Sequence, residues 1–214
     1  GNNPTGAVYS KEVLVYLVNK CEESGCWLLS DETYSKLNYS KEYYSLINHK
    51  FPKLMVITSF SKMFAVPGFR TGVAIADSRV IDKITLSTST LYSCLPIFVQ
   101  LGVCIGVQSI TSIMKDVVVH YRKIIRDCME IINANDSIFC HEPEAGFYLF
   151  LDIRRTCMDD VEFTRQLLEK HKTAVTPGES FGYKGFVRAS ICGESSNVIE
   201  GIKRLIDFAD VLKK

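Results

Sequence analysis

The amino-acid sequence predicts an α/β fold: a mainly parallel sheet with flanking helices, followed by a small α+β domain at the C-terminal end. Two short apolar runs, 26–29 and 54–58, are typical of buried strands, and a helical pattern at 10–23 precedes them. Helices and strands follow in mixed order in the second half of the chain. We therefore expect a partial large domain at 1–112 and a small domain at 113–214.

The first half of the chain supplies the elements of the larger layer. Apolar side chains from Val13 to Cys21 recur every three or four residues along one helix face, and Ser10 can cap that helix. The stretch between the strand at 54–58 and the next one, at 71–76, is too short for a crossover helix. We therefore expect these two strands to be antiparallel, which makes the sheet mixed at that position.

The second half begins with a long helical connection and continues with short strands and helices. The expected elements, in chain order, are helices at 97–113 and 117–132, strands near 139 and at 147–153, a helix at 161–171, strands at 173–176 and 186–190, and a helix at 197–212. We place the boundary between the two domains near Ser112, within the helical connection.

The composition of the 214 residues excludes several classes of protein. Lys plus Arg number 25 and Asp plus Glu 24, so the net charge of +1 provides no broad field for a polyanion or an anionic bilayer. The longest apolar run, 95–107, is interrupted by Pro96, Gln100 and Gly102 and is too short to cross a bilayer. We expect neither nucleic acid nor a membrane as a partner.

The eight cysteines are dispersed and lack the paired spacing of a zinc site. We interpret them as buried thiols of a cytoplasmic protein, not as disulfides. The pair His141 and Glu144 is split by Pro143 and is more typical of a solvated turn than of a metal site. The sequence therefore predicts no bound metal.

Candidate functional residues recur at intervals that match one strand-helix-strand step. Asn3 lies 28 residues before Asp31, and Asp31 lies 31 residues before Lys62, whereas such a step takes about 30 residues. Because the carboxyl ends of neighbouring strands form the functional edge of an α/β sheet, we expect these three residues to share one cleft. Ser59 precedes Lys62 in the segment SFSK, and Arg70 follows in GFR.

The side chains of this set suit an anionic cofactor and carbonyl chemistry. A lysine amine that is neutral in a partly desolvated pocket can form an imine with an aldehyde. A hydroxyl and a guanidinium, from Ser59 and Arg70, can hydrogen bond a phosphate. A carboxylate, from Asp31, can keep a ring nitrogen protonated and so make the ring an electron sink.

At these residues the sequence resembles the class I and II aminotransferases of the aspartate aminotransferase superfamily, the fold type I enzymes that use pyridoxal 5'-phosphate. The resemblance implies the corresponding fold, a cis peptide bond at Asn3–Pro4, and an amino-terminal part of the family fold that these residues lack. The segments that carry it are NNPTG at 2–6, SFSKMFAVPGFRTG at 59–72, PEAGFYLFLD at 143–152, TPGESFG at 176–182 and FVRAS at 186–190.

The resemblance implies a role for each residue that would contact the cofactor. Lys62 would be the catalytic residue, which forms the imine and later moves the proton between substrate and cofactor. Asp31 would pair with the pyridine nitrogen, and Tyr34 would hydrogen bond the phenolic oxygen. The residues implied to bind the phosphate are Ser59, Ser61 and Arg70.

Two residues are implied to bind the substrate. Arg188 would hold the substrate α-carboxylate with two hydrogen bonds, and Asn3 would contact both the substrate and the phenolic oxygen of the cofactor. The implied substrates are an L-amino acid and a 2-oxo acid, and the full-length enzyme would be a homodimer.

Three functions remain open at this stage. The leading hypothesis is an aminotransferase, of which the isolated 214-residue chain is expected to be inactive. The same residues would serve a carbon-sulfur lyase or a decarboxylase of the same fold, because in all three reactions the cofactor ring withdraws electrons from the bound substrate. A cofactor-free interaction module is the third hypothesis, from another class.

Overall fold

The computed structural model describes residues 1–39 and 43–213 and divides into two compact units. Unit 1 comprises Gly1 and Val8–Asp116, and unit 2 comprises Asn2–Ala7 together with Val117–Lys214. The division falls inside helix α5 (Ile110–Asn133). Each unit contains helices and a sheet, so the chain is an α/β protein.

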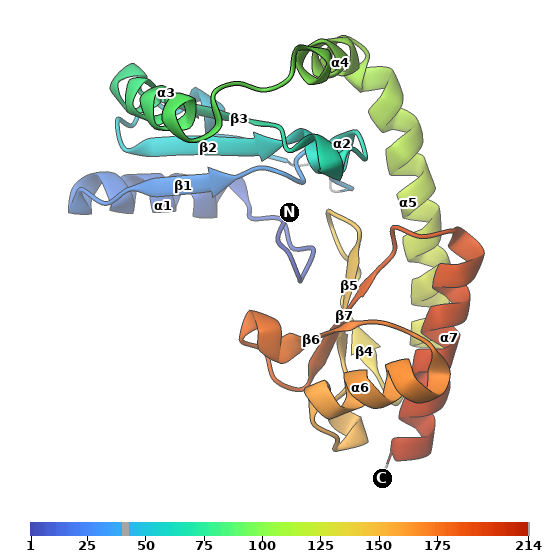
Figure 1. Ribbon diagram of the computed structural model, residues 1–214. Coiled ribbons are helices and arrows are strands. Elements are labelled where there is room, and N and C mark those ends of the chain that lie inside the picture. Colours follow the sequence, from blue (N-terminus) through green and yellow to red (C-terminus); the bar gives the residue numbers. More distant parts are fainter. Residues whose placement is uncertain (40–42, 214) are drawn as a thin grey trace. The chain divides into compact units, whose positions relative to one another are not determined.

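Unit 1 is built on a three-stranded sheet in the order β1–β2–β3 (Figure 1). Strand β1 (Leu28–Asp31) is parallel to β2 (Leu54–Ser59), and β3 (Gly72–Ala76) is antiparallel to β2. The short connection between β2 and β3 holds only α2 (Phe60–Met63) and a 3-10 turn (Pro67–Phe69), so the chain cannot cross back over the sheet. The antiparallel β3 is as predicted, and the sheet is mixed, not mainly parallel.

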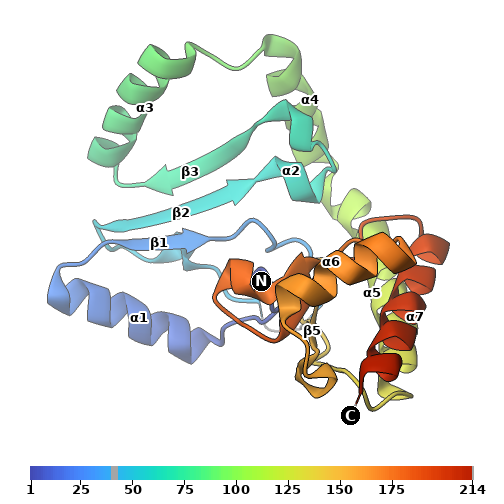
Figure 2. The same ribbon diagram turned by 60° about the horizontal axis from the view of Figure 1, so that its bottom comes forward.

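Helix α1 (Lys11–Ser24) lies beside β1 and closes a small core (Figure 2). The Ser10 hydroxyl accepts a hydrogen bond from the backbone N–H of Val13 at 3.4 Å, which confirms the predicted cap. Gly25, with φ of 65°, ends the helix in the left-handed region. The buried residues of this core are Val18, Leu46, Phe51, Leu54 and Val56.

Two helices of unit 1, α3 and α4, expose most of their apolar side chains. Helix α3 (Ser78–Tyr92) has no buried residue, and α4 (Ile97–Gln108) buries Val99. The large apolar side chains exposed on these two helices include Leu86, Leu91, Tyr92, Ile97, Phe98, Leu101 and Ile105.

A helix that crosses a bilayer must be both long and apolar. Within the described ranges, no single helix is long and apolar enough to cross a membrane. Helices α4 and α5 meet the criterion only as a pair, which is bent by 76°.

Unit 2 contains a four-stranded antiparallel sheet in the order β4–β5–β7–β6. Two helices accompany it, α6 (Asp160–His171) and α7 (Ser195–Leu212), and α7 runs beside the C-terminal part of α5 in both views (Figures 1 and 2). The strands are β4 (Phe139–Cys140), β5 (Tyr148–Asp152), β6 (Thr176–Pro177) and β7 (Phe186–Ser190).

The core of unit 2 is closed by side chains from every one of its larger elements. Alternate residues of β5 and β7 point inward, and α6 and α7 cover them with apolar side chains. The residues with no measurable exposure include Leu149, Leu151, Ile153, Phe163, Leu167, Val187, Ile191 and Leu205. Each buried side chain of this size contributes about 1.5–3 kcal/mol relative to the exposed state.

The segment Asn2–Ala7 belongs to unit 2 although it starts the chain. Its Asn3–Pro4 peptide bond is cis, as the resemblance implies. The carbonyl oxygen of Gly6 accepts hydrogen bonds from the backbone N–H groups of Glu144 and Ala145, at 3.0 and 2.9 Å. A Cβ atom on residue 6 would lie 2.4 Å from Cβ of Pro143, so the close approach requires glycine.

The cysteines correct one expectation. All eight are free thiols, but only Cys128 and Cys140 are buried. Cys21 is half-buried and packs against the core of unit 1, and the other five are exposed, among them Cys94 and Cys104 beside and within α4. Apolar sequence context therefore overestimated their burial.

Candidate functional site

Four of the predicted site residues lie at one edge of the unit 1 sheet. Asp31 is the last residue of β1 and Ser59 the last residue of β2, and the parallel pairing aligns Asp31 with Ile57. The two strand ends are therefore neighbours, as the spacing predicts. Ser61 and Lys62 follow directly in α2.

The backbone around Lys62 is fixed by a short helical turn. The Ser59 hydroxyl accepts a hydrogen bond from the backbone N–H of Ser61 at 3.2 Å and so caps α2. The N–H of Phe60 donates to the carbonyl oxygen of Thr71 at 3.2 Å, which ties the turn to the start of β3. Ser61 is buried and Lys62 is half-buried, and both directly follow the end of β2 in the chain.

Arg70 ends the same connection in a constrained conformation. Its φ of 51° places a non-glycine residue in the left-handed region, and Ala65 has φ of 54°. Two such residues within one connection are uncommon and often accompany functional turns. The Arg70 side chain is exposed, and its Nη1 donates to the carbonyl oxygen of Pro67 at 3.0 Å.

Asp31 and Tyr34 occupy the turn that follows β1. The Asp31 carboxylate is exposed and accepts a hydrogen bond from the backbone N–H of Thr33 at 3.0 Å. The Tyr34 ring is buried, with 9% of the residue exposed. The exposed carboxylate retains oxygen lone pairs for a further partner. The roles of both residues toward a cofactor stay predictions.

Glu32, between these two residues, was missed by the sequence reasoning. Its carboxylate accepts hydrogen bonds from the hydroxyls of Ser30, Tyr43 and Ser45 and from the N–H of Leu46, at 2.7–3.2 Å. Burial, and then the hydrogen bond to Glu32, raise the pKa of Tyr43 well above its usual range. This network fixes the end of β1, and the only local signal for it was the acidic residue next to Asp31.

Arg188 and Asn3 meet inside unit 2. Arg188 lies on β7, and its Nη1 donates to the side-chain oxygen of Asn3 at 2.9 Å. Its Nη2 donates to the Thr176 hydroxyl at 3.2 Å. The guanidinium carbon lies 4.4 Å from the ring centre of Tyr148 and 4.8 Å from that of Phe181. Two aromatic faces and two hydrogen bonds therefore fix the plane of the guanidinium.

The hydrogen bonding of the Arg188 guanidinium is incomplete at its Nε atom. It is buried, and among the described residues it has no hydrogen-bond partner. A buried donor without a partner costs about 1–3 kcal/mol. A carboxylate matches the geometry of a guanidinium edge and can accept from two of its N–H groups. The arrangement therefore suits a small carboxylate ligand.

The spacing predicts that Asn3 lies at a strand end, and this prediction is wrong. Asn3 sits in a turn of unit 2, held by the contacts of Gly6, and not at the end of a strand. The structure thus brings Asn3 together with Arg188, whereas the other predicted residues belong to unit 1.

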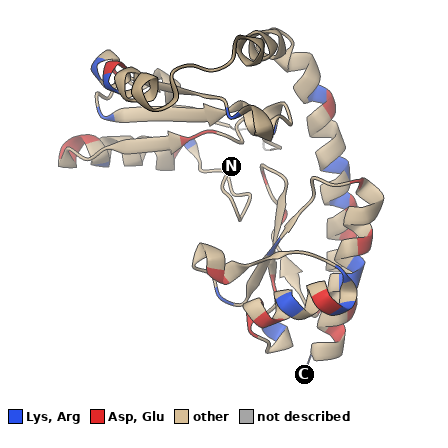
Figure 3. Ribbon diagram, viewed as in Figure 1, with Lys and Arg blue, Asp and Glu red and all other residues tan. Residues whose placement is uncertain are grey.

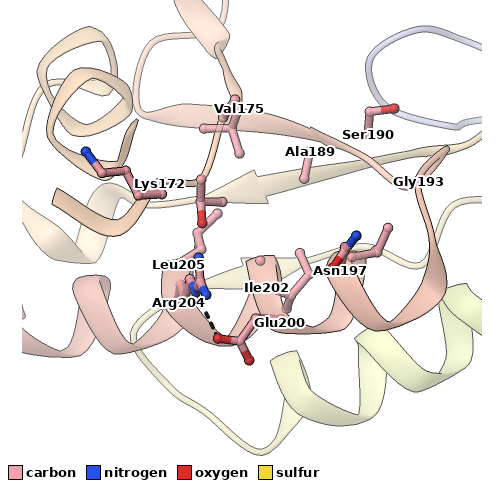
Figure 4. Close-up of a pocket in the computed structure, with 14 residues that line it drawn as sticks. Lys172, Val175, Ala189, Ser190, Gly193, Asn197, Glu200, Ile202, Arg204 and Leu205 are labelled. Carbon is pink, nitrogen blue, oxygen red and sulfur yellow. Dashed lines mark hydrogen bonds and ion pairs between the residues drawn. The ribbon is translucent and has the colours of Figure 1, made fainter. Parts of the chain in front are cut away.

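A separate cavity of about 350 Å³ lies in unit 2 between α7 and the segment before β6 (Figure 4). Ala189 and Ser190 of β7 line it together with Asn197 of α7. At its rim, Glu200 and Arg204 form an ion pair at 2.8 Å, which neutralises both charges. No predicted site residue lines this cavity.

Among residues 1–39 and 43–213, no group of three or more His, Cys, Asp and Glu side chains could hold a metal ion.

Comparisons with known proteins show the family to which the chain belongs. A family model described as aminotransferase class I and II matches residues 2–205. An aspartate aminotransferase of Thermotoga maritima is 31% identical over 209 residues, which are 97% of this chain and 54% of that protein. One of Thermococcus kodakarensis is 32% identical over 194 residues, 90% and 51% of the two chains. The chain spans about half the length of the curated relatives it matches.

Solved structures give the same similarity. The crystal structure of the Thermotoga maritima aspartate aminotransferase superposes with a TM-score of 0.87 at 30% identity, covering 98% of this chain and 54% of that chain. The aspartate aminotransferase of Thermus thermophilus with maleate has a TM-score of 0.91 at 28% identity, covering 97% and 55%.

Proposed function

Because the chain belongs to the class I and II aminotransferase family, we propose that it is the part of a pyridoxal 5'-phosphate enzyme that carries the catalytic lysine and the substrate-binding arginine. The enzyme transfers an amino group from an L-amino acid to a 2-oxo acid. Unit 1 is then part of the large cofactor-binding domain, and unit 2 is the small domain. The observation that carries the proposal is the partly satisfied guanidinium of Arg188.

Arg188 binds the α-carboxylate of the substrate in this proposal. Asn3 and Thr176 occupy one N–H group on each terminal nitrogen, and the aromatic rings prevent rotation of the guanidinium. Each terminal nitrogen keeps one further N–H group, and these two can donate to the two carboxylate oxygens. The relatives named aspartate aminotransferase support an acidic amino acid as one substrate.

The residues of the unit 1 edge fit the implied cofactor by the chemistry of their donors. Hydroxyls from Ser59 and Ser61 and the guanidinium of Arg70 suit a phosphate. Asp31 is exposed at the neighbouring strand end, and its carboxylate can accept a hydrogen bond from a protonated ring nitrogen. When bound, the cofactor supplies an aldehyde and an electron-withdrawing ring.

Lys62 is the base of the reaction in this proposal. Its Nζ supplies the amine that holds the cofactor aldehyde and then moves the proton at the substrate α-carbon. Asp31 keeps the proton on the ring nitrogen. Because α2 and the bond from Phe60 to Thr71 fix the backbone, the lysine needs little reorganisation to reach its position.

Several further features belong to the same proposal. The whole enzyme is a homodimer with amino acid and 2-oxo acid substrates, and its activity is that of the complete protein. Eight free thiols suit the reducing environment of the cytoplasm.

The proposal is tested by locating the cofactor. The protein is mixed with pyridoxal 5'-phosphate, reduced with borohydride and digested, and mass spectrometry then identifies the modified lysine. We expect modification at Lys62 and its loss in Lys62→Arg, with Lys83→Arg in the exposed part of α3 as the matched control. Equal labelling of all exposed lysines would contradict the proposal and would favour the interaction module.

A product assay separates the reactions that share this site. Aspartate and 2-oxoglutarate are supplied to the complete protein loaded with the cofactor, and glutamate and oxaloacetate are measured. Release of ammonia from a sulfur amino acid would instead assign a lyase, and release of carbon dioxide a decarboxylase.

A further inference from the structure

A buried carboxylate lies behind the Arg188 site without touching it. Asp160 is 1% exposed and begins helix α6. Its Oδ2 accepts a hydrogen bond from the backbone N–H of Glu179 at 2.7 Å, and its Oδ1 accepts one from the N–H of Gly185 at 3.1 Å. A carboxylate is tolerated in the interior only when hydrogen-bond donors of the protein replace water, and these two N–H groups do so for Asp160.

These two bonds hold both ends of one loop, which we call the 178–185 loop. It contains a 3-10 turn (Gly178–Phe181), and the N–H of Tyr183 donates to the carbonyl oxygen of Gly178 at 3.0 Å. A Cβ atom on residue 178 would lie 2.1 Å from the carbonyl oxygen of Tyr183, so the loop is closely packed on itself. Asp160 therefore fixes the position of a compact loop by its two ends.

The 178–185 loop carries one of the two aromatic rings that contact Arg188. The ring centre of Phe181 lies 4.8 Å from the guanidinium carbon, and Phe181 also packs edge-on against Phe150 of β5 at 6.4 Å. The other ring, Tyr148, comes from β5 and is independent of the loop. A shift of the loop would thus remove one aromatic contact and leave the other in place.

We propose that Asp160 is a positioning residue for carboxylate binding: it fixes the 178–185 loop so that Phe181 holds the Arg188 guanidinium in its binding orientation. The inference rests on the proposed function for the identity of the ligand, which is the substrate carboxylate. The link from Asp160 to Arg188 through the loop stands on the contacts of unit 2 alone.

The neighbouring Asp159 provides a matched control. It caps the same helix, and its exposed carboxylate accepts hydrogen bonds from the N–H groups of Val161 and Glu162 at 3.0 and 3.1 Å. Asp159→Asn makes the same chemical change one residue away and keeps an oxygen that can cap the helix, while Asp159 has its two backbone hydrogen bonds from α6. An effect of the lost negative charge at the start of α6 would therefore appear in both variants.

Glu179 allows the same bond to be removed from its other side. Glu179→Pro deletes the N–H that donates to Asp160, at a position in the first turn of the 3-10 helix where proline is tolerated. Glu179→Ala loses the same exposed side chain and keeps the N–H. The difference between these two variants isolates the hydrogen bond and does not require any change at Asp160.

Two measurements follow each variant. Heteronuclear NMR records the Nε–H signal of Arg188, whose shift depends on the ring of Phe181, in the absence of ligand. Maleate titration then gives the affinity of the site. We expect Asp160→Asn and Glu179→Pro to move the Nε–H signal toward that of Phe181→Leu and to weaken maleate binding about tenfold, equivalent to about 1.4 kcal/mol.

The controls should keep the signal and affinity of the unmodified protein. The inference is overturned if Asp159→Asn and Glu179→Ala produce the same changes, or if Asp160→Asn and Glu179→Pro leave the Arg188 signal unmoved. If the unmodified protein fails to bind maleate, the proposed ligand is wrong, and the Nε–H signal alone still decides whether Asp160 positions Arg188.

Discussion

The two compact units hold their candidate functional residues in different ways. In unit 2 the guanidinium of Arg188 is held by hydrogen bonds and rings from the same unit, over a core with many fully buried side chains. In unit 1, Asp31 and Arg70 are exposed, and helices α3 and α4 bury almost none of their apolar residues. Helix α4 also has no charged residue, whereas α6 and α7 have many (Figure 3).

This difference teaches where binding geometry is already set. The candidate site of unit 2 has its guanidinium already held, so binding of the proposed ligand there would need little ordering of side chains. The edge of unit 1 supplies the right groups on a fixed backbone, but exposed charges interact weakly with a ligand until water is removed. We therefore expect burial by ligand or protein to strengthen the unit 1 site more than the unit 2 site.

The largest expected effect sharpens the contrast between the two cores. Phe163→Ala removes a fully buried ring of unit 2 and should lower the free energy of unfolding by about 3–5 kcal/mol. Phe98→Ala removes a ring of α4 that is 67% exposed and should change it by less than about 0.5 kcal/mol. Urea unfolding with hydrogen exchange assigns each loss to its unit. A comparable loss in both variants would show that α4 is covered in solution.

The next effect concerns the preorganised site itself. Arg188→Lys keeps the positive charge but loses the planar fork, so maleate affinity should fall about 30-fold, as for the loss of a hydrogen bond between charged groups. Calorimetric titration measures the change. Arg79→Lys, at an exposed pair with Asp77, is the control and should leave maleate affinity unaltered.

A smaller effect is expected at the end of β1. Glu32→Ala leaves four donors without their acceptor and should lower the free energy of unfolding by about 1–3 kcal/mol. Glu22→Ala, on the exposed side of α1, serves as the reference. Equal stability of the two variants would break the conclusion that Glu32 organises this end of the sheet.

The smallest effect depends on pH. Burial, and then the neighbouring Cys192, raise the pKa of Tyr121 to about 12. A tyrosine in the unfolded chain has a pKa of about 10, so the folded state holds this proton more tightly. The contribution of Tyr121 to the free energy of unfolding is therefore complete below about pH 10 and is lost as the pH rises toward about 12. Urea midpoints between pH 9 and pH 12 should fall less steeply in Tyr121→Phe. Parallel curves would refute the assignment.

Local chemistry was predictable from the sequence, and tertiary contacts were not. The cap at Ser10, the antiparallel β3 and the strand ends at Asp31 and Ser59 follow from signals within a few residues or from connection length. Strand β1 begins two residues later than predicted because its pairing starts at Leu28, which leaves Trp27 exposed. Apolar pattern alone does not reveal register.

The residues that were missed act through partners distant in the sequence. Glu32 is bound by donors up to 14 residues away, and Asp160 by donors 19 and 25 residues away. The sequence around an acidic residue at a helix start or strand end is the same whether its carboxylate is solvated or accepts hydrogen bonds from a distant loop. Only the folded contacts distinguish these two cases.

The placement of Asn2–Ala7 in unit 2 has a consequence for biosynthesis. These residues are translated before residues 8–116, which form most of unit 1, whereas their hydrogen-bonding partners at Glu144, Ala145 and Arg188 are translated after them. Residues 2–7 can form these hydrogen bonds only after their partners have been translated. Closing a loop of more than a hundred residues costs conformational entropy and slows folding. A gene fragment encoding 117–214 alone would yield an arginine without its amide partner, and fusing the hexapeptide onto that fragment should restore it.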